Sequence, residues 1–183
     1  MMIMAVLMLL PVCASAQNAG LQKMASILKK TSTITADVVR TRHREAVTKD
    51  AVAKGKFTYK NSSKMNIVFS ADDKLIMEGK TFTMVRDGKK RVAEVGGKSP
   101  MEPMLNMLSC IVSGTELKNA KVEDNGSVVT ITPQTANGKK QKRQMYQSFV
   151  LTIDGKNHLL KSIRLNEKGA NYTQFDFSNV IQK

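Results

Sequence analysis

This sequence of 183 residues has few of the side chains that most often build active sites and nucleic-acid interfaces. It contains no tryptophan, two histidines and two cysteines, and aromatic residues make up 5% of the chain. Few aromatic side chains means few platforms on which nucleic-acid bases could stack. A metal site would need cysteine or carboxylate partners at short spacing from His43 or His158, and His43 lies in the basic run Arg40–Arg44, which is unfavourable for a metal ion. We therefore expect no metal site and no cofactor.

Signals for a nucleophilic enzyme are also scarce. The chain has no G-x-S-x-G sequence, so the nucleophile elbow of serine hydrolases is unsupported. Cys110 lies beside an apolar helical stripe, where a cysteine usually packs as a small hydrophobe. Acidic residues are sparse and most fall in turns. We predict no catalytic residues and no enzymatic activity, with an exported hydrolase kept as an alternative.

The N-terminus has the pattern of a cleaved signal peptide, Met1–Ala16. Residues 1–10 are all apolar, and Ala14-Ser15-Ala16 supplies the small-x-small pattern of a cleavage site, although no Lys or Arg precedes the apolar run. Such a run is too short to span about 30 Å of hydrocarbon as an anchor. Lipidation of Cys13 is a second alternative. We predict a signal peptide at 1–16, one domain at 17–183 and a periplasmic location. Cys110 is then the single cysteine of the mature chain, which excludes an internal disulfide.

Positive charge dominates the surface chemistry. Lys and Arg number 29 against 15 Asp and Glu, which gives a formal net charge of +14. A basic surface attracts nucleic acid, anionic lipid or acidic proteins, and export disfavours nucleic acid. The basic loop at 136–143 is expected to be a solvated hairpin tip or a contact for anionic lipid or an acidic partner.

Two segments have helical spacing. Residues 18–30 carry Leu21, Met24, Ile27 and Leu28 on one face, and residues 100–112 carry a second apolar face. We predict an amphipathic helix for each segment.

The rest of the domain alternates apolar and polar residues with period two, which is typical of half-buried strands. Asp87-Gly88 is a hairpin signal. Five or six strands in meander order are expected between the helices, and the segment 146–153 is expected to be the longest strand. The predicted strand ranges are 34–38, 53–59, 65–69, 75–77, 82–84, 92–95, 121–122, 128–131, 146–153, 159–165 and 172–177.

About ten antiparallel strands cannot stay flat, so they should roll into a barrel or half-barrel. The two helices then cover its concave face. We predict a mainly β fold, a curved antiparallel sheet forming an incomplete barrel with a helical lid. Methionines on the predicted inward faces are ordinary core filling or an adaptable surface for apolar ligands.

Several short motifs follow one another in a distinctive order. They are Ala36-Asp37-Val38, the glycine-led strand Gly55–Lys60, Arg86-Asp87-Gly88, the Pro-containing helix at 100–112, Ile131-Thr132-Pro133 and the closing segment Glu167–Val180. Over nearly the whole mature chain, this order resembles the LolA family of periplasmic carriers of outer-membrane lipoproteins. Where that family commonly has Arg-Pro, with the arginine holding the lid closed, this chain has Lys60-Asn61, so Lys60 is a candidate substitute.

The resemblance implies a monomeric, non-catalytic carrier that binds lipoprotein acyl chains, or another apolar lipid, under the two helices. It also implies transient membrane contact, an inner-membrane complex that releases the cargo and an outer-membrane acceptor. An envelope lipid-binding protein, sensor or interaction module on the same fold is the alternative. The predicted lipid-binding residues are Leu21, Met24, Ile27, Leu28, Phe57, Tyr59, Met65, Ile67, Phe69, Met77, Phe82, Met84, Met101, Met104, Leu105, Leu108 and Ile111.

Overall fold

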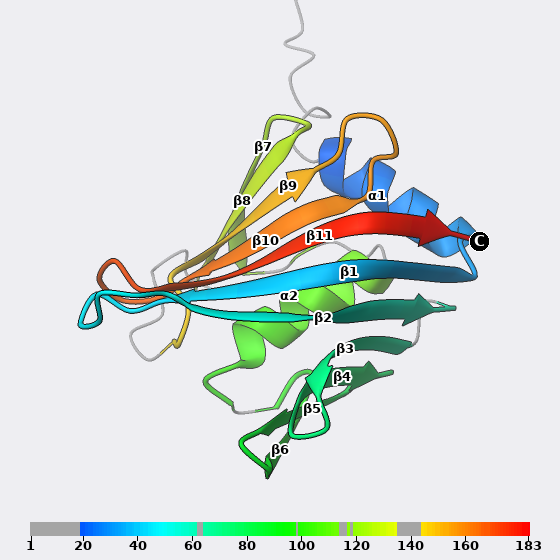
Figure 1. Cartoon of the computed structure of the whole chain (residues 1–183). Coiled ribbons are helices and arrows are strands. Elements are labelled where there is room, and N and C mark those ends of the chain that lie inside the picture. The colour runs from blue at the N-terminus through cyan, green and yellow to red at the C-terminus, as the bar shows by residue number, and fades with distance from the viewer. Residues whose placement is uncertain (1–18, 62–63, 98, 114–116, 118, 135–143) are drawn as a thin grey trace, which may run out of the picture.

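The computed structural model describes residues 19–61, 64–97, 99–113, 117, 119–134 and 144–183. The expected signal peptide at 1–16 and the basic loop at 136–143 lie outside these residues. The described chain forms one antiparallel sheet of 11 strands with two helices, which confirms the predicted incomplete barrel with a helical lid (Figure 1). The elements are α1 (Ala19–Lys30), β1 (Thr33–His43), β2 (Ala51–Lys60), β3 (Lys64–Ser70), β4 (Asp73–Glu78), β5 (Thr81–Arg86), β6 (Lys89–Glu94), α2 (Glu102–Ser113), β7 (Ala120–Asp124), β8 (Val128–Pro133), β9 (Ser148–Ile153), β10 (Leu160–Asn166) and β11 (Tyr172–Gln182).

The sheet consists of two meanders joined at its centre. The strand order is β6-β5-β4-β3-β2-β1-β11-β10-β9-β8-β7, so the first and last strands pair with each other. Strands β6 and β7 form the two edges, and the sheet curves without closing (Figure 1). The β6 edge begins with exposed Lys89, Lys90 and Arg91, charges that discourage pairing with another chain.

The longest strands lie at the centre of the sheet, where β1 pairs with β11. Strands β1 and β11 have 11 residues each, whereas β9 has six, so the prediction that 146–153 is the longest strand was wrong. The β9–β10 ladder begins only at Ser148, which pairs with Asn166. Tyr146 precedes this ladder, and its ring packs 5.7 Å from that of Phe149. The apolar pattern continues through Tyr146, but the strand does not.

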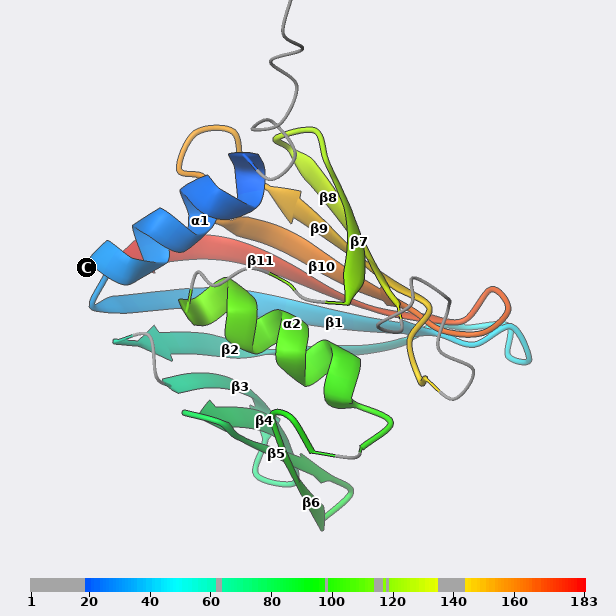
Figure 2. The same ribbon diagram turned by 180° about the vertical axis from the view of Figure 1, so that it is seen from behind.

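Both helices lie on the concave side of the sheet (Figure 2). In α1, the buried residues Gly20, Met24 and Leu28 recur every fourth position, which puts them on one face. Lys29 and Lys30 occupy the last turn, where cations favour the helix dipole. Neither helix in the described part of the chain is long and apolar enough to cross a membrane.

The first turn of α1 is held by a residue far away in the sequence. The main-chain N–H groups of Gly20 and Leu21 donate hydrogen bonds of 2.9 and 3.1 Å to Oδ2 of Asp124 at the end of β7. A carboxylate at this position satisfies two main-chain donors that have no partner within the helix. A Cβ at residue 20 would lie 2.8 Å from Oδ1 of Asp124, so glycine permits this close approach.

The predicted hairpin turn at Asp87-Gly88 is confirmed. Both residues have positive φ, 50° and 73°, as a two-residue turn that follows the sheet twist requires. The turn joins β5 to β6, whose ladder ends with Arg86 paired to Lys89. It therefore leaves Arg86 at the last position of β5.

Candidate functional site

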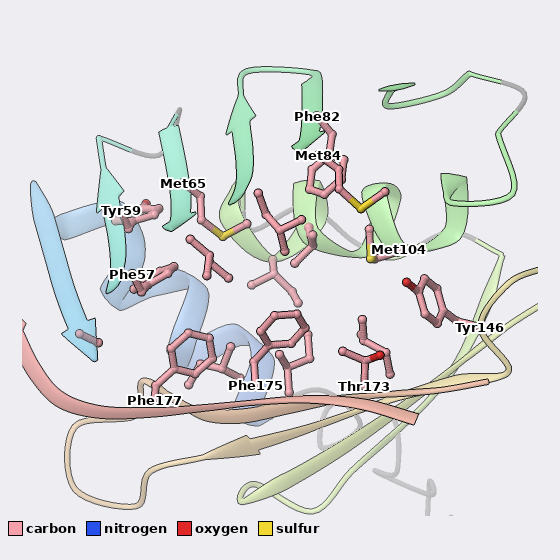
Figure 3. Close-up of a pocket in the computed structure, with 18 of the residues that line it drawn as sticks. Phe57, Tyr59, Met65, Phe82, Met84, Met104, Tyr146, Thr173, Phe175 and Phe177 are labelled. Carbon is pink, nitrogen blue, oxygen red and sulfur yellow. The ribbon is translucent and has the colours of Figure 1, made fainter. Parts of the chain in front are cut away.

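The space between the sheet and the helices contains a cavity of about 330 Å³ (Figure 3). Of its 28 lining residues, only Arg44, Arg86, Glu167 and Thr173 have side chains that are neither apolar nor aromatic. The full lining is Met24, Leu28, Ile34, Ala36, Arg44, Phe57, Tyr59, Met65, Ile67, Leu75, Phe82, Met84, Arg86, Met101, Met104, Leu108, Ile111, Met145, Tyr146, Leu159, Leu160, Ile163, Leu165, Glu167, Thr173, Phe175, Phe177 and Val180.

Strands β2 to β5 build one wall of this cavity through cross-strand pairs. Phe57 lies opposite Ile67, and Tyr59 lies opposite Met65. Because side chains two residues apart along a strand share a face, these pairs form a continuous apolar surface. Figure 3 shows Phe57, Tyr59 and Met65 side by side on this wall.

The helices cover this surface with apolar side chains. Helix α1 contributes Met24 and Leu28, whereas Met104, Leu108 and Ile111 come from α2. The Tyr59 hydroxyl donates a hydrogen bond of 3.0 Å to the main-chain carbonyl of Leu28. The sheet is thus tied to the last turn of α1.

Lys60 was a candidate for holding the lid, and the structure places it elsewhere. It is exposed, and it follows Tyr59, whose side chain lines the cavity. Adjacent strand residues point to opposite faces, so Lys60 is on the convex side, away from the helices. Tyr59, the residue before Lys60, is hydrogen-bonded to the lid helix α1.

The structure brings 12 of the 17 predicted lipid-binding residues to the cavity. They are Met24, Leu28, Phe57, Tyr59, Met65, Ile67, Phe82, Met84, Met101, Met104, Leu108 and Ile111.

The other five predicted residues pack around the cavity without lining it. Leu105 is fully buried, Met77 is 4% exposed, and Leu21 and Ile27 are partly buried against the core. The guanidinium carbon of Arg40 lies over the ring of Phe69, 4.2 Å from the ring centroid.

Sequence reasoning missed the opposite wall, which β1, β10 and β11 supply. Ile163, Leu165, Phe175 and Phe177 alternate with polar residues in the predicted strands, so the signal was present. The ring of Phe177 meets that of Phe57 edge-on at 5.2 Å and links the two walls. Figure 3 shows Phe175 and Phe177 facing the wall that carries Phe57.

One end of the cavity is polar. Tyr146 and Thr173 lie together at the end away from Phe57 and Tyr59 (Figure 3). Glu167 accepts a hydrogen bond of 3.3 Å from the Thr173 hydroxyl and forms an ion pair of 3.1 Å with Arg44. Burial raises the pKa of the Tyr146 hydroxyl, and Glu167 adds to the rise, so the hydroxyl is neutral at pH 7.

Groups that could perform nucleophilic or metal chemistry are not gathered in this cavity. Within the described residues, no cluster of three or more His, Cys, Asp or Glu could hold a metal ion. His43 lies 2.8 Å from Asp50 and stacks on Tyr172, and neither His43 nor His158 lines the cavity. Cys110 is buried in α2, as expected of a packed cysteine.

Comparisons with known proteins find resemblance only among solved structures. No family model matches the chain, and no curated protein does. The chain is similar to a LolA superfamily protein from Nitrosomonas europaea, with 8% identity, 93% of this chain and 94% of that chain covered, and a TM-score of 0.43. It is also similar to a DUF1329 family protein from Desulfovibrio piger (14% identity, 91% and 93% covered, TM-score 0.45).

A third similar structure is a putative outer membrane lipoprotein-sorting protein domain from Vibrio parahaemolyticus (12% identity, 88% and 92% covered, TM-score 0.42). These matches include the family that the sequence motifs resemble.

Proposed function

We propose that this protein binds acyl chains of lipoproteins, or of another envelope lipid, in the cavity and carries them toward the outer membrane without catalysis. The observation that supports this most is the apolar cavity of about 330 Å³ between the sheet and the two helices. Its volume is at the low end of the range of about 300 to 1,000 Å³ for small-molecule sites, which suits one chain better than several. Cargo with more chains requires the helices to move outward.

Burial of an acyl chain supplies enough free energy for carriage without a covalent bond. At about 0.8 kcal/mol per buried CH₂, a 16-carbon chain contributes on the order of 10 kcal/mol before ordering costs. Release also matters, because a carrier must give up its cargo. Met65, Met84, Met101 and Met104 line the cavity, and their flexible side chains can repack when a chain enters or leaves.

An envelope sensor or interaction module on the same fold is the alternative function. A fully packed interior would favour it, and this chain has a cavity instead. The test is uptake of a fluorescent 16-carbon fatty-acyl probe by purified, delipidated protein. We expect saturable binding, and absence of uptake would contradict the proposal.

A pair of variants on one strand makes this test specific to the cavity. Ala36 lines the cavity, whereas its neighbour Thr35 is exposed. Ala36→Phe should fill space inside the cavity and weaken probe binding, and Thr35→Phe should leave it unchanged. Thermal unfolding of both variants checks that each is folded. Equal binding by the two variants would place the probe outside the cavity.

We also propose that the protein acts in the periplasm after removal of residues 1–16. Mass spectrometry of protein produced in a Gram-negative host should then show Gln17 as the N-terminal residue. An uncleaved chain would contradict this part of the proposal.

A further inference from the structure

The concave face of β1 changes from apolar to cationic along its length. Its buried residues Ile34, Ala36 and Val38 are followed, at the same period of two, by Arg40, Arg42 and the residue just after the strand, Arg44. The arginines of this face therefore lie beyond the apolar part of the wall.

The two terminal nitrogens of Arg40 are engaged within the protein, whereas its buried Nε has no hydrogen-bond partner among the described residues. Its two terminal nitrogens donate hydrogen bonds of 2.9 and 2.6 Å to the two carboxylate oxygens of Asp73, and its guanidinium covers the ring of Phe69. Only 7% of its side chain is exposed. We regard this pair as structural, because a bidentate, stacked guanidinium has few donors left for a ligand.

Arg42 and Arg86 are less completely matched, whereas Arg44 pairs with Glu167 and donates hydrogen bonds to the main-chain carbonyls of His43 and Tyr172. The Nε atoms of Arg42 and Arg86 are buried and have no hydrogen-bond partner among the residues that the structure describes. Arg44 and Arg86 line the cavity. Arg86 ends β5 and pairs in register with Asp73, the carboxylate that Arg40 already occupies.

These cations lie close enough to disfavour one another. The pKa of Arg42 is lowered, first by burial and then by the charges of Arg86, Arg44 and Arg40. In the described residues, Asp73 and Glu167 are the carboxylates that face these four arginines. Arg40 pairs with Asp73 and Arg44 with Glu167, so in the described part of the chain two positive charges, those of Arg42 and Arg86, have no acidic partner of their own. Partly buried positive charge without a partner is costly, and a bound anion offsets that cost.

The same place offers a neutral donor at the end of the apolar space. Tyr146, whose pKa burial raises, lies at this end of the cavity together with Thr173, whose hydroxyl already donates to Glu167 (Figure 3). We call Arg42, Arg44, Arg86 and Tyr146 the cationic end. An amphiphile whose chain lies between Phe57 and Phe177, under the helix methionines Met24 and Met104, would place its headgroup at the cationic end.

We propose that the cationic end binds an anionic headgroup, a phosphate or a carboxylate, of a lipid whose acyl chain occupies the cavity. The guanidinium groups suit such oxygens because their paired N–H donors match two acceptor oxygens at once. This inference rests on the proposed acyl binding, but it makes a separate claim. It holds that the cavity selects anionic lipids over neutral lipids of the same chain length.

The test compares three 16-carbon probes that differ only in the headgroup: hexadecyl phosphate, palmitate and the neutral hexadecanol. Each displaces a fluorescent fatty-acyl probe from the purified, delipidated protein at monomeric probe concentrations. We expect at least one anionic probe to bind about tenfold or more tightly than hexadecanol, with the difference shrinking as salt rises. A preference for hexadecyl phosphate assigns a phospholipid headgroup, and a preference for palmitate assigns a free fatty acid.

Charge-neutral variants assign the preference to named residues. Arg42→Gln and Arg86→Gln should each lower affinity for the preferred anionic probe about tenfold more than affinity for hexadecanol. Arg91→Gln removes the same charge from an exposed position on the β6 edge and should leave the preference intact. Thermal unfolding checks that each variant folds, and Arg86→Lys, which keeps the charge, should restore part of the preference.

The outcomes separate this inference from the proposed function. Equal binding of all three probes would overturn the headgroup site and leave acyl binding standing. Loss of the preference in Arg91→Gln, or its survival in both Arg42→Gln and Arg86→Gln, would also overturn the site. No binding of any probe would overturn both proposals.

Discussion

The hydroxyl of Tyr59 on β2 donates a hydrogen bond of 3.0 Å to the main-chain carbonyl of Leu28, in the last turn of α1. Tyr59 is 1% exposed, so this bond is made away from water. Both residues line the cavity, which makes the bond a direct link between the sheet and the helical lid.

Tyr59→Phe should therefore loosen the lid. We expect the free energy of unfolding to fall by about 1 to 3 kcal/mol, because a buried carbonyl loses a partner. Release of a bound acyl probe should become faster. Urea unfolding and stopped-flow probe release measure the two effects. Tyr172→Phe removes the same hydroxyl from a residue outside the cavity lining, and an equal acceleration there would contradict this role of Tyr59.

Asp124 should contribute to stability through the first turn of α1. Asp124→Ala removes the acceptor for the N–H groups of Gly20 and Leu21, so we expect a loss of about 1 to 2 kcal/mol in the free energy of unfolding. Glu123→Ala is the control, because the side chains of Glu123 and its partner Lys121 are each 60% exposed. That exposed pair is worth only about 0 to 1 kcal/mol. Equal losses would argue against capping by Asp124.

Asp73 should make stability depend on pH in the acidic range. The hydrogen bonds from Arg40 hold the pKa of Asp73 below its ordinary value of 3.8, against a smaller opposing effect of burial. A depressed pKa in the folded state contributes stability at pH values above the unfolded pKa, and this contribution is lost as pH falls through the folded pKa. The stability difference between the wild type and Asp73→Asn should thus be constant above about pH 5 and shrink below pH 4.

Urea unfolding of both proteins between pH 2.5 and 7 measures this difference. Asp87→Asn, at an exposed turn, is the control and should show no comparable change over that range. A difference between wild type and Asp73→Asn that stays constant down to pH 2.5 would contradict the assigned effect of Arg40.

The sheet and helices were predictable because each burial pattern is local. Period-two alternation from Ile34 to Phe177 identified the strands, and the spacing of Met24 and Leu28 identified the first lid helix. Alternation does not say where a ladder begins, which is why the strand starting at Tyr146 was predicted too long. The side chain of Tyr146 lines the cavity, although the residue precedes the paired part of the strand.

The wall of the cavity that β1, β10 and β11 supply could not be predicted from the sequence. Phe175 and Phe177 showed the right periodicity, but periodicity does not reveal that β11 pairs with β1 and so faces the same space as Phe57. The cationic end was hidden for the same reason. Arg42 and Arg86 are far apart in sequence, and the order of β1 to β5 brings them to one end of the cavity.

The most direct test of the acyl-binding account uses the methionines as internal reporters. Spectra of protein labelled with ¹³C at the methionine methyl groups are recorded as a 16-carbon fatty acid is added. Six methionines line the cavity, whereas Met77 and Met107 are buried without lining it. The lining six are Met24, Met65, Met84, Met101, Met104 and Met145. Acyl binding in the cavity predicts saturable shifts at the lining methionines that are much larger than those at Met77 and Met107. Equal shifts at all eight, or no saturable shift at the lining six, would contradict it.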